Sequence, residues 1–154
     1  VLFVVYNKND ELRLRAYIPE FEIRTKQAGY NWQPCDLTNS FPEWLSQHRY
    51  REKYFAKPEL LDGYDHGVIE EFTEDLTEMM AGVLEKADER TVVALSGVGS
   101  LFGVSSVSTV VEKVASKVFG RLVVFFPGEV ENNNYRLLDA RDGWNYLAVN
   151  ITAS

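Results

Sequence analysis

Three short, mostly apolar runs constrain the fold of this chain more than any other feature. They are "VLFVVY" at residues 1–6, "TVVAL" at residues 91–95 and "RLVVFF" at residues 121–126. Such runs, rich in β-branched and aromatic residues, are typical of strands covered on both faces. They alternate with helical patterns, which indicates a parallel sheet. We therefore predict an α/β protein with a mostly parallel sheet flanked by helices, in a Rossmann-like arrangement of three layers.

Helical patterns separate these strand runs. Apolar residues recur at spacings of three and four from Val68 to Ala87, and valines do the same from Val104 to Val118. Ser40, before "FPEWL", is predicted to cap another helix. Residues 11–28 fit either an alternating strand or a helical stripe. We favour the helix, with a kink or a restart at Pro19.

The remaining segments add strands at the edges of the sheet. Residues 32–37 are a candidate second strand, and Pro127-Gly128 is predicted to break the strand that precedes it. A polar turn is expected at residues 132–134. Residues 135–139 and 144–151 flank "ARDG", in which the Asp-Gly pair signals a hairpin. The sequence therefore predicts a C-terminal antiparallel hairpin.

Length and composition indicate one domain over residues 1–154. A chain of this length can bury a hydrophobic core without disulfides or metal ions. The chain starts at Val1, inside an apparent strand, so we expect further residues upstream. The single Cys35 excludes an internal disulfide framework and favours a reducing compartment. No apolar run approaches the ~20 residues that cross a bilayer. We therefore expect a cytoplasmic protein without a membrane partner.

The charge balance argues against direct nucleic-acid binding. Acidic residues number 23 against 16 basic ones, and the formal net charge of −7 repels phosphate backbones. Two basic clusters are exceptions: Arg13, Arg15, Arg24 and Lys26 form one, and His48, Arg49, Arg51 and Lys53 form the other, interleaved with Tyr50, Tyr54 and Phe55. Interleaved aromatics can stack on single-stranded bases. A solvated helical face explains the same pattern.

A glycine-rich loop, "SGVGSLFGVSS", follows the second apolar run at residues 96–106. Glycines between a strand and a helix let backbone amides approach a phosphate. This loop lacks the Gly-Lys-Ser/Thr sequence of a Walker loop, and its third glycine comes one position later than in a dinucleotide fingerprint. A structural turn is the simpler interpretation. A degenerate nucleotide or phosphate site over residues 97–103 stays the alternative function, with Gly97, Gly99, Ser100 and Ser105 as its candidate residues.

The chain contains no complete set of catalytic residues. The serines after the glycine loop fit helix capping, because no histidine lies in that half of the chain to activate them. Asp62, Asp65 and His66 form the compact group of potential metal ligands, and a polar loop accounts for them. We therefore predict a non-enzymatic protein with no catalytic residues, no cofactor and no metal.

Motifs over most of the chain carry a family resemblance. They are "LFVVYNKNDELRLRAYI" at residues 2–18, "CDL" at 35–37, "TVVALSGVGSLFGVSSVSTVVEKV" at 91–114, "RLVVFFPGE" at 121–129 and "YRLLDARDGWNYLAV" at 135–149. A strand entering a small-residue loop and a serine-containing helix, an aromatic-Pro-Gly sequence at 126–128 and the Asn145-Tyr146 pair resemble the BrxB family of BREX phage-defence systems. The family tends to place a Pro and an Arg where this chain has Gly103 and Val104.

The resemblance implies an α/β protein of a bacterial or archaeal defence system, from a family with no established enzymatic activity. It also implies a partner among the other BREX proteins, with PglZ, an alkaline-phosphatase-like component, as the expected one. A role in protein–protein interaction needs exposed anchors, and tryptophan is a frequent one. Trp32, Trp44 and Trp144 are the candidate interaction residues, although core packing explains each of them too.

Overall fold

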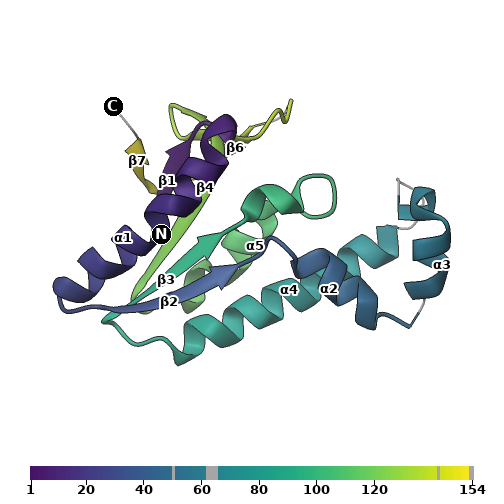
Figure 1. Ribbon diagram of the computed structural model, residues 1–154, viewed down its shortest axis with the longest axis horizontal. Coiled ribbons are helices and arrows are strands. Elements are labelled where there is room, and N and C mark those ends of the chain that lie inside the picture. The colour runs from purple at the N-terminus through teal and green to yellow at the C-terminus, as the bar shows by residue number, and fades with distance from the viewer. Residues whose placement is uncertain (50, 62–65, 142, 153–154) are drawn as a thin grey trace.

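The computed structural model of the chain describes residues 1–49, 51–61, 66–141 and 143–152. A parallel sheet in the order β2-β3-β4-β1-β7 forms its centre (Figure 1). Its strands are β1 (Leu2–Tyr6), β2 (Asn31–Asp36), β3 (Thr91–Ser96), β4 (Arg121–Glu131) and β7 (Val149–Thr152). The prediction of an α/β fold with a mostly parallel sheet is confirmed.

Helices cover both faces of this sheet. They are α1 (Glu11–Gln27), α2 (Ser40–Gln47), α3 (Arg51–Ala56), α4 (His66–Lys86) and α5 (Val107–Val114), with short 3-10 helices η1 (Lys8–Asp10), η2 (Pro58–Leu61), η3 (Val98–Leu101) and η4 (Ala115–Lys117). The connection through α1 runs from β1 to the edge strand β2, and the chain then returns through β3 to β4. Parallel crossovers are right-handed, so this reversal places α1 on one face and α4 and α5 on the other (Figure 1).

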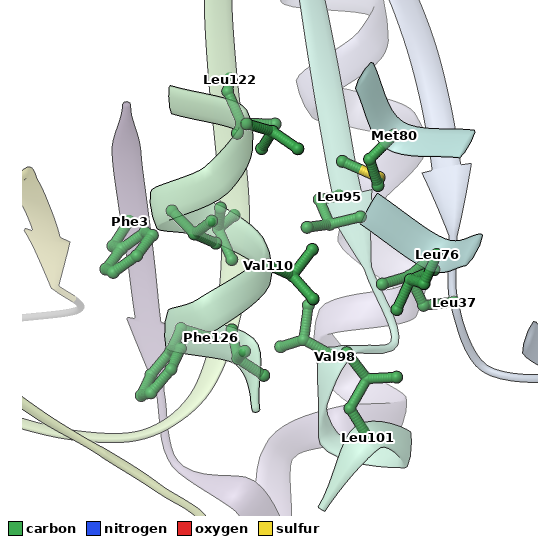
Figure 2. Close-up of a cluster of buried hydrophobic side chains, with 14 of the residues drawn as sticks. Phe3, Leu37, Leu76, Met80, Leu95, Val98, Leu101, Val110, Leu122 and Phe126 are labelled. Carbon is green, nitrogen blue, oxygen red and sulfur yellow. The ribbon is translucent and has the colours of Figure 1, made fainter. Parts of the chain in front are cut away.

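The two faces bury different side chains of the same strands, because successive residues of a strand point to opposite faces. Phe3 faces the cluster that contains α4 and α5, whereas Val4 faces the cluster at α1. Figure 2 shows the larger cluster, which contains Leu95 and Leu122 of the sheet and Val110 of α5. The smaller cluster contains Val4, Ala94 and Phe125, packed against Leu14, Ile18 and three other partly buried residues. The α1 face is therefore covered less thickly than the opposite face.

β4 does not end at Pro127-Gly128 as predicted; it continues to Glu131 and changes partners. Its first half pairs in parallel with β3 and β1, and its second half pairs antiparallel with β5 (Asn134–Leu137). Pro127 is tolerated because β3 pairs with β4 only up to Val124. At Gly128, a Cβ atom would lie 2.0 Å from the carbonyl oxygen of Arg136, so only glycine permits the approach of β5.

The C-terminal hairpin is confirmed, but the residues after it differ from the prediction. Asn132 and Asn133 adopt positive φ angles of 49° and 63° in the turn between β4 and β5. β5 then pairs antiparallel with β6 (Trp144–Asn145). The predicted strand 144–151 is in fact two short strands, because the chain crosses over so that β7 lies parallel to β1.

Two local predictions about helices were wrong, and a third is answered in part. α1 passes through Pro19 as one continuous helix, which excludes a restart, while a kink there stays a prediction. Ser40 does not cap α2, because its hydroxyl donates to the carbonyl oxygen of Leu37 at 2.8 Å and Asn39 is the capping position. The valine helix covers Val107–Val114 rather than 104–118, since Ser106 caps it and η4 follows directly.

Truncation of a core leucine tests the packing of the sheet against α5. Leu122 is fully buried and Leu12 is 83% exposed. We expect Leu122→Ala to lower the free energy of unfolding by about 2–5 kcal/mol, because it removes contacts and leaves a cavity. Leu12→Ala is the matched control, with an expected change within about 0.5 kcal/mol. Urea denaturation of both variants checks this, and equal losses would contradict the packing described above.

Candidate functional site

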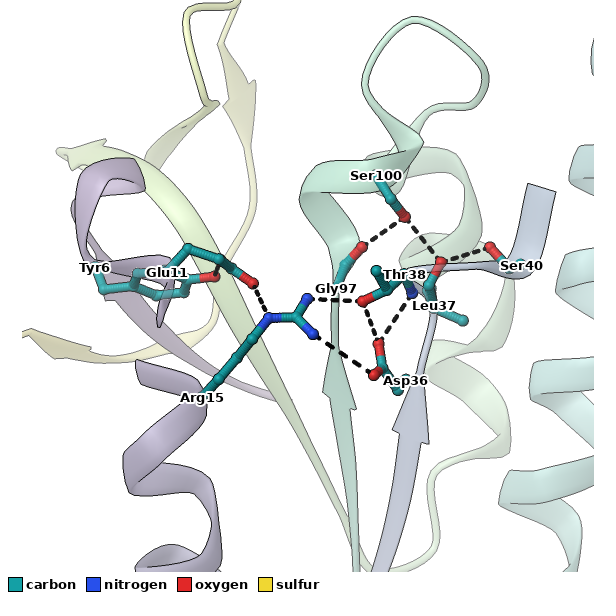
Figure 3. A network of polar contacts seen from close by, with 9 residues as sticks. All are labelled: Tyr6, Glu11, Arg15, Asp36, Leu37, Thr38, Ser40, Gly97 and Ser100. Atoms are coloured by element: carbon teal, nitrogen blue, oxygen red, sulfur yellow. Dashed lines mark hydrogen bonds and ion pairs between the residues drawn. The ribbon is translucent and has the colours of Figure 1, made fainter. Parts of the chain in front are cut away.

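The carboxyl ends of the parallel strands meet at one edge of the sheet, where α/β proteins usually bind ligands. Figure 3 shows a polar network across this edge. Arg15 of α1 donates from Nε to Oε1 of Glu11 at 2.9 Å and from Nη2 to Oγ1 of Thr38 at 2.7 Å. The backbone N–H and the hydroxyl of Thr38 both donate to Oδ1 of Asp36, at 2.9 and 2.5 Å. The network therefore ties α1 to the end of β2.

Electrostatics favour a charged Asp36 in this network. Partial burial raises the pKa of its carboxyl group, but the hydrogen bonds from Thr38 and the positive charge of Arg15 outweigh burial and hold the pKa below the ordinary value. Tyr6 donates its hydroxyl hydrogen to Glu11, and burial followed by that hydrogen bond raises the pKa of Tyr6. At neutral pH the edge thus contains an ionised aspartate beside a guanidinium, which neutralise one another.

Gly97 lies directly against the turn after β2. Its φ is +71°, in the left-handed region that favours glycine. A Cβ atom there would lie 2.5 Å from Oγ1 of Thr38 and 2.6 Å from Oδ1 of Asp36. The glycine that begins the loop therefore allows close contact between the ends of β3 and β2. The space beside this glycine is filled by the side chains of Thr38 and Asp36, which leaves no room there for a phosphate.

The other loop residues make similar structural contacts. The Ser100 hydroxyl lies 2.8 Å from the carbonyl oxygen of Leu37 and 2.7 Å from that of Gly97, and it can donate to either (Figure 3). Gly99 faces Pro127, whose Cγ atom would lie 3.3 Å from an added Cβ. The loop thus packs between the end of β2 and the part of β4 at Pro127.

Ser105 lies apart from these three residues. Its Oγ atom is 2.8 Å from Oγ1 of Thr73 on α4. Ser106 accepts a hydrogen bond from the backbone N–H of Thr109 at 3.3 Å, so it caps α5 as the sequence suggested for this group of serines. The structure therefore brings Gly97 and Ser100 together at the end of β2, whereas Ser105 contacts α4.

A cavity of about 190 Å³ lies between the loop and the hairpin. Its described lining includes Phe102, Phe126, Tyr135 and Trp144, together with the serines at the start of α5, and no charged side chain. Within the described residues, no buried side-chain nitrogen or oxygen lacks a hydrogen-bond partner. The polar side chains that line the cavity each have a hydrogen-bond partner within the protein: Ser105 with Thr73, Ser106 with Ser108, Tyr135 with Asn150 and Trp144 with Glu112.

The three candidate tryptophans lie on different elements, β2, α2 and β6, and each is partly buried against a core cluster. The indole Nε1 of Trp44 donates to Oδ2 of Asp75 at 2.7 Å, and that of Trp144 donates to Oε1 of Glu112 at 2.8 Å. Trp32 packs at the α1 face. The structure therefore does not gather them on one surface.

The basic clusters have partners within the chain. Arg24 and Lys26 pair with the glutamates four residues earlier, at 2.6 and 2.5 Å, which is typical of a solvated helical face. Tyr54, expected as a possible stacking residue, is 2% exposed and packs in a core cluster with α2 and α4. Phe55 is exposed, and Tyr50 lies outside the described residues.

The remaining candidates for chemistry concern metals and the thiol. Asp62 and Asp65 lie outside the described residues, and His66 begins α4. In the described part of the chain, no group of three or more His, Cys, Asp or Glu residues is placed to hold a metal ion. Burial, followed by the charge of Asp36, raises the pKa of Cys35 to about 11, which makes its thiol a poor nucleophile at neutral pH.

Sequence reasoning missed the polar network of this edge. Arg15 was noted only as a member of a basic cluster. The local signal was "CDLT", in which Asp36 and Thr38 follow a strand two residues apart, a pattern typical of an Asx turn. The partner from α1 is distant in sequence, so no local pattern points to it.

The fold and the site define an α/β protein with a mostly parallel sheet. The side chains at the carboxyl ends of its strands contact one another. The model of the family described as "BREX protein BrxB" matches residues 40–151, more than half of the chain. The chain therefore belongs to the BrxB family and is a component of BREX defence, as its motifs suggested. No curated protein and no solved structure matches it. None of the helices in its described segments has the length and apolar character needed to span a bilayer.

A pair of glycine substitutions tests the contact between the ends of β2 and β3. Gly97 and Gly103 both have positive φ, but only Gly97 has atoms within 4 Å of an added Cβ. We expect Gly103→Ala to cost about 1–2 kcal/mol from backbone strain alone. Gly97→Ala should cost about 2 kcal/mol more, because the new methyl group displaces Thr38 and Asp36. Equal losses in chemical denaturation would show that the contact contributes nothing.

Ligand screening tests the alternative function of the glycine loop. Because Ser100 is within hydrogen-bonding distance of two backbone carbonyls, and Thr38 and Asp36 fill the space beside Gly97, we expect millimolar ATP, GTP or inorganic phosphate to leave the melting temperature unchanged. A ligand at 100 times its dissociation constant would add about 2.7 kcal/mol to stability. A stabilising shift that disappears in Ser100→Ala would instead establish an anion site at this loop.

Proposed function

We propose that this protein is a non-enzymatic adaptor of a BREX system that acts in the cytoplasm by docking onto another BREX protein, with PglZ as the partner. Membership of the BrxB family supports the system. The adaptor role rests on the distribution of side chains over the described surface. Polar groups at the carboxyl edge are bonded to one another, whereas large apolar side chains elsewhere are exposed.

The observation that carries this proposal is the exposure of apolar side chains on α1 and at the C-terminal strand. On α1 they are Leu12, Tyr17, Phe21 and Ile23, and near or in β7 they are Leu147, Val149 and Ile151. Tyr17, Phe21 and Ile151 line one groove together. Contiguous exposed apolar surface on a protein of this kind is typical of a binding site for another protein.

The tryptophans named as interaction residues support this role less well. Trp44 and Trp144 use their indole N–H groups within the chain, on Asp75 and Glu112. An interface anchor buries an aromatic body that is accessible in the free protein. The exposed aromatic residues of α1 meet that description better, since Tyr17 is 50% exposed.

Association with the co-encoded PglZ protein tests the proposal. The two proteins are purified separately, mixed at micromolar concentration and passed through a size-exclusion column with light-scattering detection. We expect a complex whose mass is the sum of both proteins, because an adaptor contributes binding rather than chemistry. A PglZ protein from an unrelated BREX system serves as the control and should elute separately. Independent elution of the cognate pair would overturn the adaptor proposal.

A further inference from the structure

The two edge strands of the parallel sheet differ in how they are protected. An exposed strand edge presents unpaired backbone N–H and C=O groups that recruit another strand. β2, at one edge, contains Pro34, which has no N–H to offer, and the charged Asp36. β7, at the other edge, has the sequence Val-Asn-Ile-Thr with neither a proline nor a charge. Within the described residues, β7 has no strand on its outer side.

The register of β7 defines which backbone groups face outward. The N–H of Val149 donates to the carbonyl oxygen of Val1 at 3.4 Å, so the backbone of Val149 faces β1. Consecutive residues of a strand direct their backbone groups to opposite sides, so Val149 and Ile151 face β1. Asn150 and Thr152 therefore direct their N–H and C=O groups outward, where a further strand would lie.

β7 is also held in place from the face opposite α1. The hydroxyl of Tyr135 donates to the side-chain oxygen of Asn150. Tyr135 is itself buried and packs edge-on against Phe3, with ring centroids 4.6 Å apart. This hydrogen bond restrains β7 at Asn150, and restraint before binding lowers the entropy cost of association.

An apolar groove lies beside this edge, on the α1 face. It has a volume of about 440 Å³, and Val4, Tyr17, Phe21 and Ile151 contribute to its lining. Ile151 is 46% and Val149 62% exposed. A strand added to β7 would place alternate side chains on this face, so its apolar residues would enter the groove. The charged residues of the groove lining are Asp10 and Arg13, one of each sign.

We infer that the outer edge of β7 and the groove beside it bind an extended segment of another BREX protein, apolar at alternate positions, which adds to the sheet as a further strand. This deepens the adaptor proposal and rests on it. Strand addition of this kind takes affinity from the main chain and specificity from side-chain pockets. A second copy of the chain is the less suitable occupant, because each copy carries a net charge of −7 and the two repel.

Substitution at Thr152 separates strand addition from ordinary surface contact. Thr152→Pro removes an outward N–H and should leave pairing with β1 intact, whereas Thr152→Val keeps the N–H. We expect Thr152→Pro to raise the dissociation constant for the cognate PglZ protein about tenfold or more, because binding loses a main-chain hydrogen bond. Thr152→Val should stay within about twofold. Isothermal titration calorimetry gives the constants, and thermal melting confirms that both variants fold.

A second pair of variants tests the groove. We expect Ile151→Lys to weaken binding about a hundredfold, because it places a charge in the apolar site. Phe119→Lys is the control, since Phe119 is 68% exposed and precedes β4 outside the groove. If the wild-type chain binds PglZ and both Thr152→Pro and Ile151→Lys bind equally well, the strand-addition inference is wrong and the adaptor proposal stands.

Two other outcomes would also be decisive. If the wild-type chain does not bind PglZ, the adaptor proposal fails, and the inference fails with it. If the chain alone elutes at twice its mass and Thr152→Pro elutes as a monomer, the edge pairs two copies of this chain and the inference of a different partner is overturned. Protection of the Asn150 and Thr152 amides from hydrogen exchange, seen only in the PglZ complex, would support the inference directly.

Discussion

Coverage of a parallel sheet on both faces is the constraint on which this structure depends. The strands β1, β3 and β4 carry apolar side chains on both faces of the sheet, and both sets have to be buried. α4 and α5 provide a thick cover on one face, whereas α1 alone covers the other. A single helix spans only part of a sheet of this width. The surface left beside α1, toward β7, is therefore a direct consequence of the chain's topology.

The residues at the carboxyl ends of the strands hold parts of this protein together. In many α/β proteins the turns after the strands hold glycines and hydroxyls open to a ligand. Here Gly97 permits the approach of Asp36 and Thr38, and Ser100 contacts the backbone of Leu37. Arg15 then adds α1 to the same contacts. The groups that resemble a phosphate loop in sequence thus join the ends of β2 and β3 and the start of α1.

The sequence predicted correctly those helices, strands and turns that depend on residues close together in the chain. Buried strands, the helix at α4 and the turn at Asn132 and Asn133 follow from apolar periodicity and turn chemistry. The continuation of β4 past Pro127 was not predictable, because it depends on β3 ending early and on the approach of β5 at Gly128. The parallel position of β7 beside β1 likewise requires knowledge of pairing across the whole chain. The polar network was missed for the same reason.

The asymmetry of the two sheet edges connects fold to function. The side chains at the carboxyl ends of the strands bond to one another, so that part of the sheet offers few groups to a ligand. The two edge strands, β2 and β7, are the other parts of the sheet with backbone groups that no strand pairs with in the described residues. Pro34 and Asp36 make β2 unsuitable for strand addition, whereas β7 is uncharged and is anchored by Tyr135. An unprotected edge is a hazard for aggregation unless a partner covers it. The net charge of −7 disfavours, at long range, the approach of a second copy of the chain. An outer edge that pairs with no described strand and a net negative charge are the two features that favour the proposed binding of a different protein over pairing of two copies.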